Sequence, residues 1–111
     1  MALNRKKFID LFVGNISNAI LHRILEKAVE DEIIRKYYDK EFINSLEIAK
    51  EYREKINPMH SALKEASQIK EIIIKKVSNE LKIRILKGYK NIDLRLVEPT
   101  TNKVLSELKV I

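Results

Sequence analysis

The chain has 111 residues, of which 45% are hydrophobic and 34% are charged, and its formal net charge is +6. This length and composition are typical of one globular domain and exclude an intrinsically disordered chain. The absence of cysteine excludes disulfides, thiolate catalysis and zinc–thiolate sites. We therefore predict a single domain over residues 1–111 in a cytoplasmic protein. The richness in Ile, Lys and Glu resembles the composition of thermophile proteins.

The first predicted helix begins near Arg5 and is the most apolar part of the sequence. Thirteen of the 22 residues from 8 to 29 are apolar and cover more than one face of a helix. Two interpretations follow: a central helix buried on several sides, or a surface that binds a second copy of the chain. The candidate interface residues are Phe8, Phe12, Ile16, Ile20 and Ile24. Charged residues interrupt the stretch, which predicts no membrane span.

Two further helices are predicted after a break at Glu30 and Asp31. A short helical segment follows the break, and Asp39 is the expected cap of the next helix, which ends near Asn57. Its apolar stripe has spacings of three and four residues: Phe42, Leu46, Ala49, Tyr52 and Ile56. Pro58 suits the first position of a third helix, which we expect to end near Asn79.

After Asn79 the apolar residues alternate with polar ones, which is typical of strands. The alternating residues are Leu81, Ile83 and Ile85, then Ile92, Leu94 and Leu96. "KGYKN" supplies the Gly and Asn of a hairpin turn, and the implied register places Arg84 opposite Asp93. A second turn at "EPTTNK" would lead into a last strand ending near Val110.

These patterns predict an α+β fold. An antiparallel bundle of three or four helices over about 5–79 would be followed by a three-stranded antiparallel β-meander over about 81–110, with the division between 1–79 and 80–111. The alternative is that the third helix continues to Leu86 and leaves a single hairpin.

Most of the positive charge lies in residues 58–91, which hold eight Lys and Arg against three Glu. Lys82, Lys87, Tyr89 and Lys90 cluster on the predicted hairpin, where cations could attract phosphate and an aromatic ring could stack on an unpaired base. The alternative is an ordinary solvated surface.

Arg53 and His60 have six residues between them, and this spacing resembles the Arg-x(4–6)-His pattern of the HEPN ribonucleases. The resemblance implies that the two side chains would act on RNA phosphate. Glu54 and the predicted strands depart from that all-helical family, so we assign no family. The alternative is a surface arginine and a surface histidine. His22, on the apolar helix, is expected to be a core or interface residue.

The sequence favours a non-enzymatic protein-interaction or assembly module that forms a homodimer through its first helix and binds an unknown protein partner. A nucleic-acid-binding protein that uses residues 82–90 is the second prediction, and a small ribonuclease with Arg53 and His60 is the third. No motif predicts a cofactor, a metal site or contact with a membrane.

Overall fold

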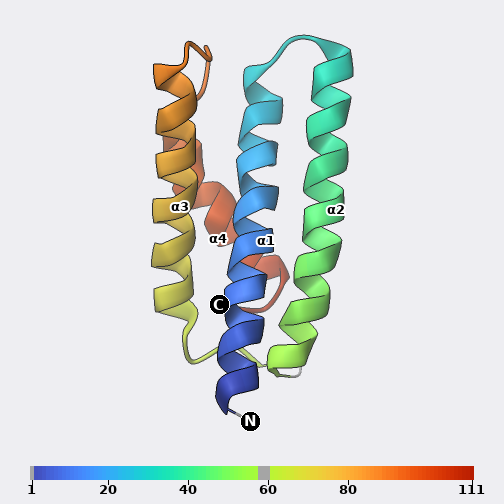
Figure 1. Cartoon of the computed structure of the whole chain (residues 1–111), viewed down its shortest axis with the longest axis vertical. Coiled ribbons are helices and arrows are strands. Elements are labelled where there is room, and N and C mark those ends of the chain that lie inside the picture. Colours follow the sequence, from blue (N-terminus) through green and yellow to red (C-terminus); the bar gives the residue numbers. More distant parts are fainter. Residues whose placement is uncertain (1, 58–60) are drawn as a thin grey trace.

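The computed structural model describes residues 2–57 and 61–111, with side chains from Asn4 onward, and this part of the chain is helical (Figure 1). Its elements are the α-helices α1 (Ala2–Ala28), α2 (Glu32–Ile56), α3 (Ala66–Leu86) and α4 (Val97–Glu107), with the short 3-10 helix η1 (Leu94–Leu96) before α4. The molecule is elongated, with extents of 44 × 23 × 21 Å.

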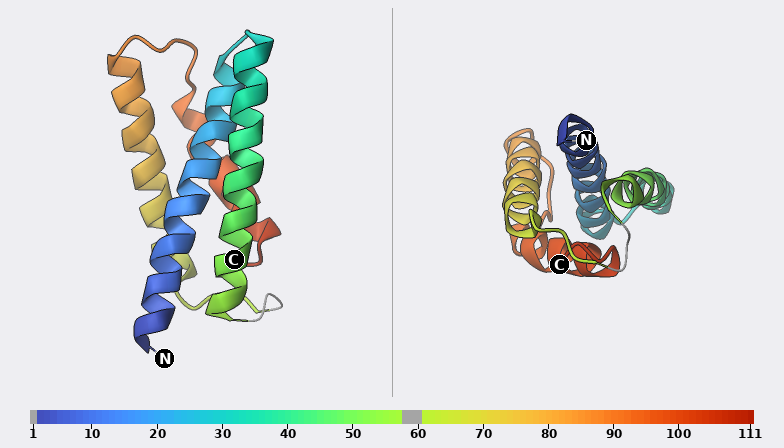
Figure 2. Two further views of the ribbon diagram at one scale, coloured as in Figure 1. Left: turned by 45° about the vertical axis from the view of Figure 1, so that its right-hand side comes forward. Right: turned by 90° about the horizontal axis from the view of Figure 1, so that it is seen from below.

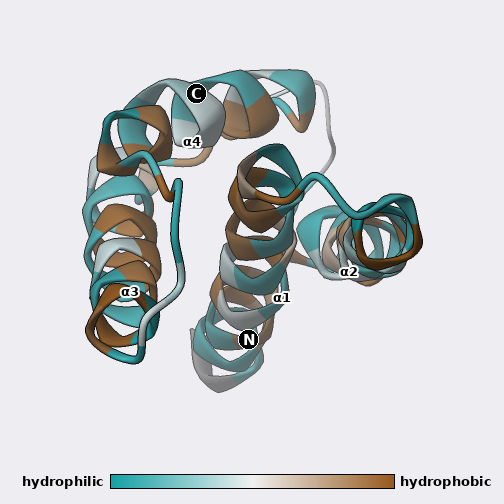
Figure 3. Cartoon of the chain, turned by 90° about the horizontal axis from the view of Figure 1, so that it is seen from above, coloured by the Kyte–Doolittle hydropathy of each residue, from teal (hydrophilic) through white to brown (hydrophobic). Residues whose placement is uncertain are grey.

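α1 is the central helix and contacts each of the other three α-helices. α2 and α3 flank it on two sides and α4 crosses behind it (Figure 2). Hydrophobic segments recur along α1 between its neighbours (Figure 3). Phe12, Ile16 and Ile20 are fully buried. The wide apolar surface of this helix is thus covered on several sides within the single chain.

By length and composition alone, the part of α1 from Asn4 to Ala28 could cross a membrane, since an 18-residue window within it reaches a mean hydropathy of 1.2. In this fold the same apolar side chains form the core of the helical bundle.

α2 is one continuous helix, so the predicted new start at Asp39 is wrong. Asp31 caps the helix, because its carboxylate accepts hydrogen bonds from the Ile33 and Ile34 backbone N–H groups at 2.9 and 3.1 Å. Asp39 instead accepts a hydrogen bond from Arg23 of α1 at 3.2 Å. The predicted start of a helix at Pro58 lies outside the described residues, and α3 begins at Ala66.

The predicted β-meander is wrong: the described residues contain no strand, and the fold is all-helical rather than α+β. The alternative end of the third helix at Leu86 is confirmed. Leu81 is buried and continues the four-residue spacing of Ile69, Ile73 and Val77 on one face of α3. Ile83 and Ile85, which suggested a strand, are 45% and 40% exposed on the outside of the helix.

The "KGYKN" segment ends a helix instead of turning a hairpin. Gly88 has φ +101°, a conformation open to glycine. The Tyr89 N–H donates to the Arg84 carbonyl and the Gly88 N–H to the Ile85 carbonyl, both at 3.0 Å, which is the Schellman pattern of a helix C-terminus. The predicted Arg84–Asp93 pair does not form: Arg84 pairs with Glu80 and Asp93 with Arg95, each at 3.0 Å.

The predicted last turn and strand form α4. Pro99 lies in the first turn of this helix, where the missing N–H removes no helical hydrogen bond. Val104, Leu105 and Leu108 are buried, at a spacing that places them on one helical face. Thr101 is also buried, and its hydroxyl donates to the Val97 carbonyl at 2.7 Å.

Candidate nucleic-acid interface

Three of the predicted nucleic-acid-binding residues lie together where α3 ends. Lys87, Tyr89 and Lys90 are exposed in and just after the helix C-cap. Lys82 is also exposed, but it lies within α3, about 200° around the helix from Arg84. The structure therefore keeps the predicted tip as a group and separates Lys82 from the face on which Arg84 lies.

Two tyrosines lie near the start of α2, which is at the same end of the bundle as the end of α3 (Figure 1). The Tyr37 and Tyr38 ring centroids are 5.8 Å apart, and Tyr38 also lies 5.7 Å from the His22 ring of α1. Tyr37 and Tyr89 are about half exposed, at 56% and 48%. We call the group Tyr37, Tyr38, Arg84, Lys87, Tyr89 and Lys90 the basic aromatic end.

The pKa of the Tyr38 phenol lies above its usual value, and charges from both parts of this end contribute to the shift. Burial raises the pKa of the Tyr38 phenol, and the neighbouring Tyr89 raises it further. The Arg84 guanidinium lowers it, and Tyr37 raises it. Residues from α2, from α3 and from the loop after α3 thus share one electrostatic environment.

The positive charge of the basic aromatic end lies on the α3 side. Arg84 pairs with Glu80 at 3.0 Å, whereas Lys87 and Lys90 take part in none of the ion pairs between described residues. The turn between α1 and α2 carries Glu30 and Asp31. Arg35 and Lys36 follow this turn on α2 and offset its acidic residues, so a phosphate group would be attracted first to the α3 side, where Lys87 and Lys90 lie.

Arg53, the candidate catalytic arginine, is fully buried near the end of α2. Nε donates to the Leu108 carbonyl at 3.1 Å, and Nη2 donates to the Ser61 and Lys109 carbonyls at 2.6 and 2.8 Å. Nη1 donates to the backbone carbonyl and the side-chain oxygen of Asn57. These bonds use all five N–H donors of a guanidinium.

The surroundings of Arg53 are structural rather than catalytic. Burial, followed by the charge of Arg5, lowers the pKa of Arg53. The all-helical fold removes one departure from the HEPN pattern, but the guanidinium has no N–H group left for a phosphate. His60 lies outside the described residues.

The five candidate interface residues of α1 lie mainly in the core. Phe12, Ile16, Ile20 and Ile24 are at most 1% exposed. Phe8 is partly buried and stacks on Tyr52, with ring centroids 6.3 Å apart. Phe12, Ile16, Ile20 and Ile24 therefore pack within one copy of the chain and offer no free surface in this fold, whereas Phe8 keeps part of its surface exposed.

Among the described residues, no group of three or more His, Asp or Glu side chains is arranged to hold a metal ion. No family model, curated protein or solved structure matches this chain. Function therefore has to be argued from the geometry of the chain itself.

No sequence pattern predicted that Tyr37 and Tyr38 lie at the same end of the molecule as the basic tip. They precede that tip by about half the chain, and no motif links them to it. One compositional feature pointed toward the site: the chain has four tyrosines, and three of them contribute to this end.

Proposed function

We propose that this protein is a non-enzymatic module that binds single-stranded nucleic acid at its basic aromatic end. The observation that carries the proposal is that the start of α2, with Tyr37 and Tyr38, and the end of α3, with Lys87, Tyr89 and Lys90 in and after its cap, lie at the same end of the bundle (Figure 1). Exposed aromatic rings can stack on unpaired bases, and lysines contact the phosphates between them. A duplex offers no unpaired base to such rings.

The proposal is tested by fluorescence anisotropy with a labelled oligo-dT of about 12 nucleotides, within the usual site size of such proteins. The double variant Lys87→Ala/Lys90→Ala should weaken binding. It should also make the slope of log binding constant against log salt concentration shallower by roughly one to two units. The matched control is Lys6→Ala/Lys7→Ala, which removes the same charge at the opposite end of α1 and should leave most of the affinity.

Tyr89 separates stacking from simple attraction of charge. Tyr89→Leu should weaken binding by about 1–3 kcal/mol, because it removes a stacking ring, whereas Tyr89→Phe should keep the affinity. Equal affinity of all the variants for oligo-dT, or equal binding of a blunt duplex, would reject the proposed function.

Self-association is a second candidate, favoured by exposed apolar side chains at the same end of the molecule. Ile33 is 81% exposed at the start of α2 and Leu86 is 87% exposed at the end of α3. Such side chains could meet their counterparts across a two-fold axis. This surface differs from the α1 surface expected from the sequence.

Light scattering at low and high salt, together with the 260/280 nm absorbance ratio, separates the two candidates. A dimer that persists at both salt concentrations and dissociates in Ile33→Glu/Leu86→Glu supports assembly. A monomer that releases nucleic acid at high salt supports the first proposal.

A further inference from the structure

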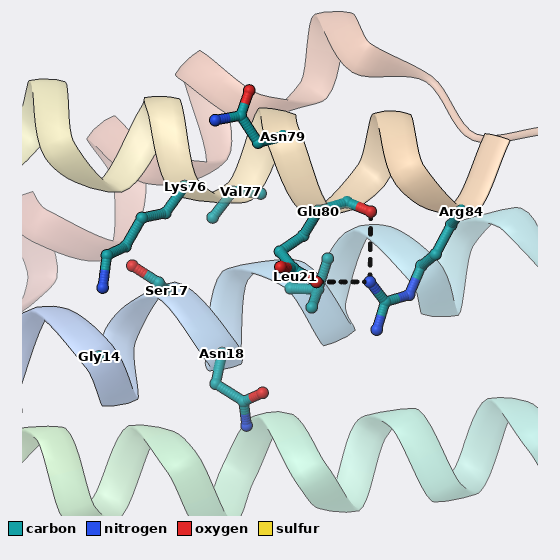
Figure 4. Close-up of a pocket in the computed structure, with 9 residues that line it drawn as sticks. All are labelled: Gly14, Ser17, Asn18, Leu21, Lys76, Val77, Asn79, Glu80 and Arg84. Atoms are coloured by element: carbon teal, nitrogen blue, oxygen red, sulfur yellow. Dashed lines mark hydrogen bonds and ion pairs between the residues drawn. The ribbon is translucent and has the colours of Figure 1, made fainter. Parts of the chain in front are cut away.

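A groove of about 440 Å³ runs between α1 and α3, on the side of α1 that faces neither α2 nor α4 (Figure 4). Leu21 and Val77 supply apolar surface, and Lys76, Glu80 and Arg84 bring charges to it. This volume lies within the range typical of pockets for small molecules.

The Ser17 hydroxyl in this groove has no hydrogen-bond partner within the described part of the chain. Ser17 is only 8% exposed, and a buried hydroxyl without a partner is unfavourable. In Figure 4 the hydroxyl points toward the same space as the ammonium group of Lys76. The site thus holds a buried donor and a cation that could share one external acceptor.

Gly14 provides open space beside Ser17. It lies in the interior of α1, where glycine is less favourable than alanine. A Cβ atom at this position would meet nothing within 4 Å. Packing within the described chain therefore does not require a glycine here, and the space above it is free for an occupant.

The charges of the groove favour an anion. Arg84 is neutralised by Glu80 at 3.0 Å. Lys76 takes part in none of the ion pairs between described residues. The uncompensated charge next to Ser17 is therefore positive.

We propose that this groove binds a small organic anion. Its oxyanion group accepts hydrogen bonds from the Lys76 ammonium and the Ser17 hydroxyl, and its apolar body lies on Leu21 and Val77. A carboxylate and a phosphate ester share this chemistry. The groove does not include the tip residues Lys87 and Lys90. It shares Arg84 with the basic aromatic end, but Arg84 is paired with Glu80, so the proposal rests on Lys76 and Ser17 and is tested apart from nucleic-acid binding.

The test is an NMR titration that follows the amide signals of the two glycines, Gly14 and Gly88. The probes are phenyl phosphate, benzoate and inorganic phosphate. Either organic anion should shift the Gly14 signal saturably and leave the Gly88 signal in place. Lys76→Ala should weaken binding about tenfold, as expected for one charge-assisted hydrogen bond. Lys75→Ala, the exposed neighbouring lysine, should not weaken it.

A second variant guards against an effect on folding. Gly14→Leu begins from a Cβ that meets nothing within 4 Å, so it should keep the helical circular-dichroism signal. Its side chain would fill the groove, so the saturable shift of the neighbouring Ser17 amide signal, present in the parent protein, should be lost. Binding of phenyl phosphate alone would identify a phosphate ester as the ligand class, and binding of benzoate alone a carboxylate. The proposal is overturned if neither organic anion shifts the Gly14 signal saturably. It is also overturned if inorganic phosphate binds as tightly as the organic anions, or if Lys75→Ala weakens binding as much as Lys76→Ala.

Discussion

Arg53 is a buried cation that takes part in none of the ion pairs between described residues, and it is satisfied by oxygens from three separate segments. It joins the end of α2 to Ser61 and to the Leu108 and Lys109 carbonyls after α4. A buried cation is usually stabilised by a carboxylate, but here neutral oxygens accept all of its hydrogen bonds. Arg53, whose spacing from His60 suggested catalysis, thus ties the end of α2 to Ser61 and to the residues that follow α4.

Replacing Arg53 by Met should lower the free energy of unfolding by about 3 kcal/mol, because buried carbonyls lose their donors. Urea unfolding measures this change. The control is Arg95→Met, at a side chain that is 91% exposed, where a change within about 0.5 kcal/mol is expected. Equal losses in the two variants would show that the guanidinium network contributes nothing specific.

The two glycines should respond oppositely to alanine. Gly14→Ala should raise the free energy of unfolding by about 0.5–1 kcal/mol, since the position is helical and a Cβ meets open space. Gly88→Ala should lower it by about 1 kcal/mol, because φ is +101° there. Thermal unfolding of both variants checks the direction of each change in stability. A loss of stability in Gly14→Ala would contradict the open space beside this position.

At the scale of elements, Arg5 and Glu65 tie the start of α1 to the start of α3. Arg5 donates to both carboxylate oxygens, at 3.0 and 2.8 Å, and to the Ile56 carbonyl at 2.9 Å. The pKa of Glu65 lies below its usual value, mainly because its carboxylate accepts hydrogen bonds from Arg5. The same hydrogen bonds raise the pKa of Arg5. The pairing therefore favours the folded state only while the carboxylate is ionised.

This sign gives a pH prediction. The stabilising effect of Glu65 should be complete above the ordinary glutamate pKa of about 4.3 and should disappear as the pH falls through the lower folded value. The difference in unfolding free energy between the parent protein and Glu65→Gln should shrink across that window. Glu51→Gln, at an exposed position on α2, is the control and should track the parent protein. A difference that grows as the pH falls would contradict the direction of the shift.

Helix spacing in the sequence predicted the apolar stripe of α2, in which Ala49 and Ile56 are buried, but it could not decide the structure after Asn79. Leu81 and Ile85 fit both a period of two and a period of four, so the pattern alone permits a strand or a helix. The burial of Leu81 with Ile73 and Val77 on one face decides for the helix. The sequence predicted that Lys87, Tyr89 and Lys90 form one group, whereas only the fold brings the start of α2, with Tyr37 and Tyr38, to the same end of the molecule (Figure 1).

At the scale of the whole molecule, the Arg53 network and the basic aromatic end lie at opposite ends of α2. Sixteen residues separate Tyr37 from Arg53 along this helix, which corresponds to about 24 Å. The central helix α1 connects the two ends through a common core. We therefore expect that substitutions can alter the stability of the fold without altering the proposed nucleic-acid interface, and the reverse.

The most direct test of the proposed function maps the bound strand onto the fold by NMR. Titration of the labelled protein with oligo-dT should shift the backbone amide signals of Tyr37, Tyr89 and Lys90 in a saturable way and leave those of Ile56 and Asn57 at the far end of α2 in place. Shifts confined to that far end, or no saturable shift at any residue, would contradict a nucleic-acid interface at the basic aromatic end.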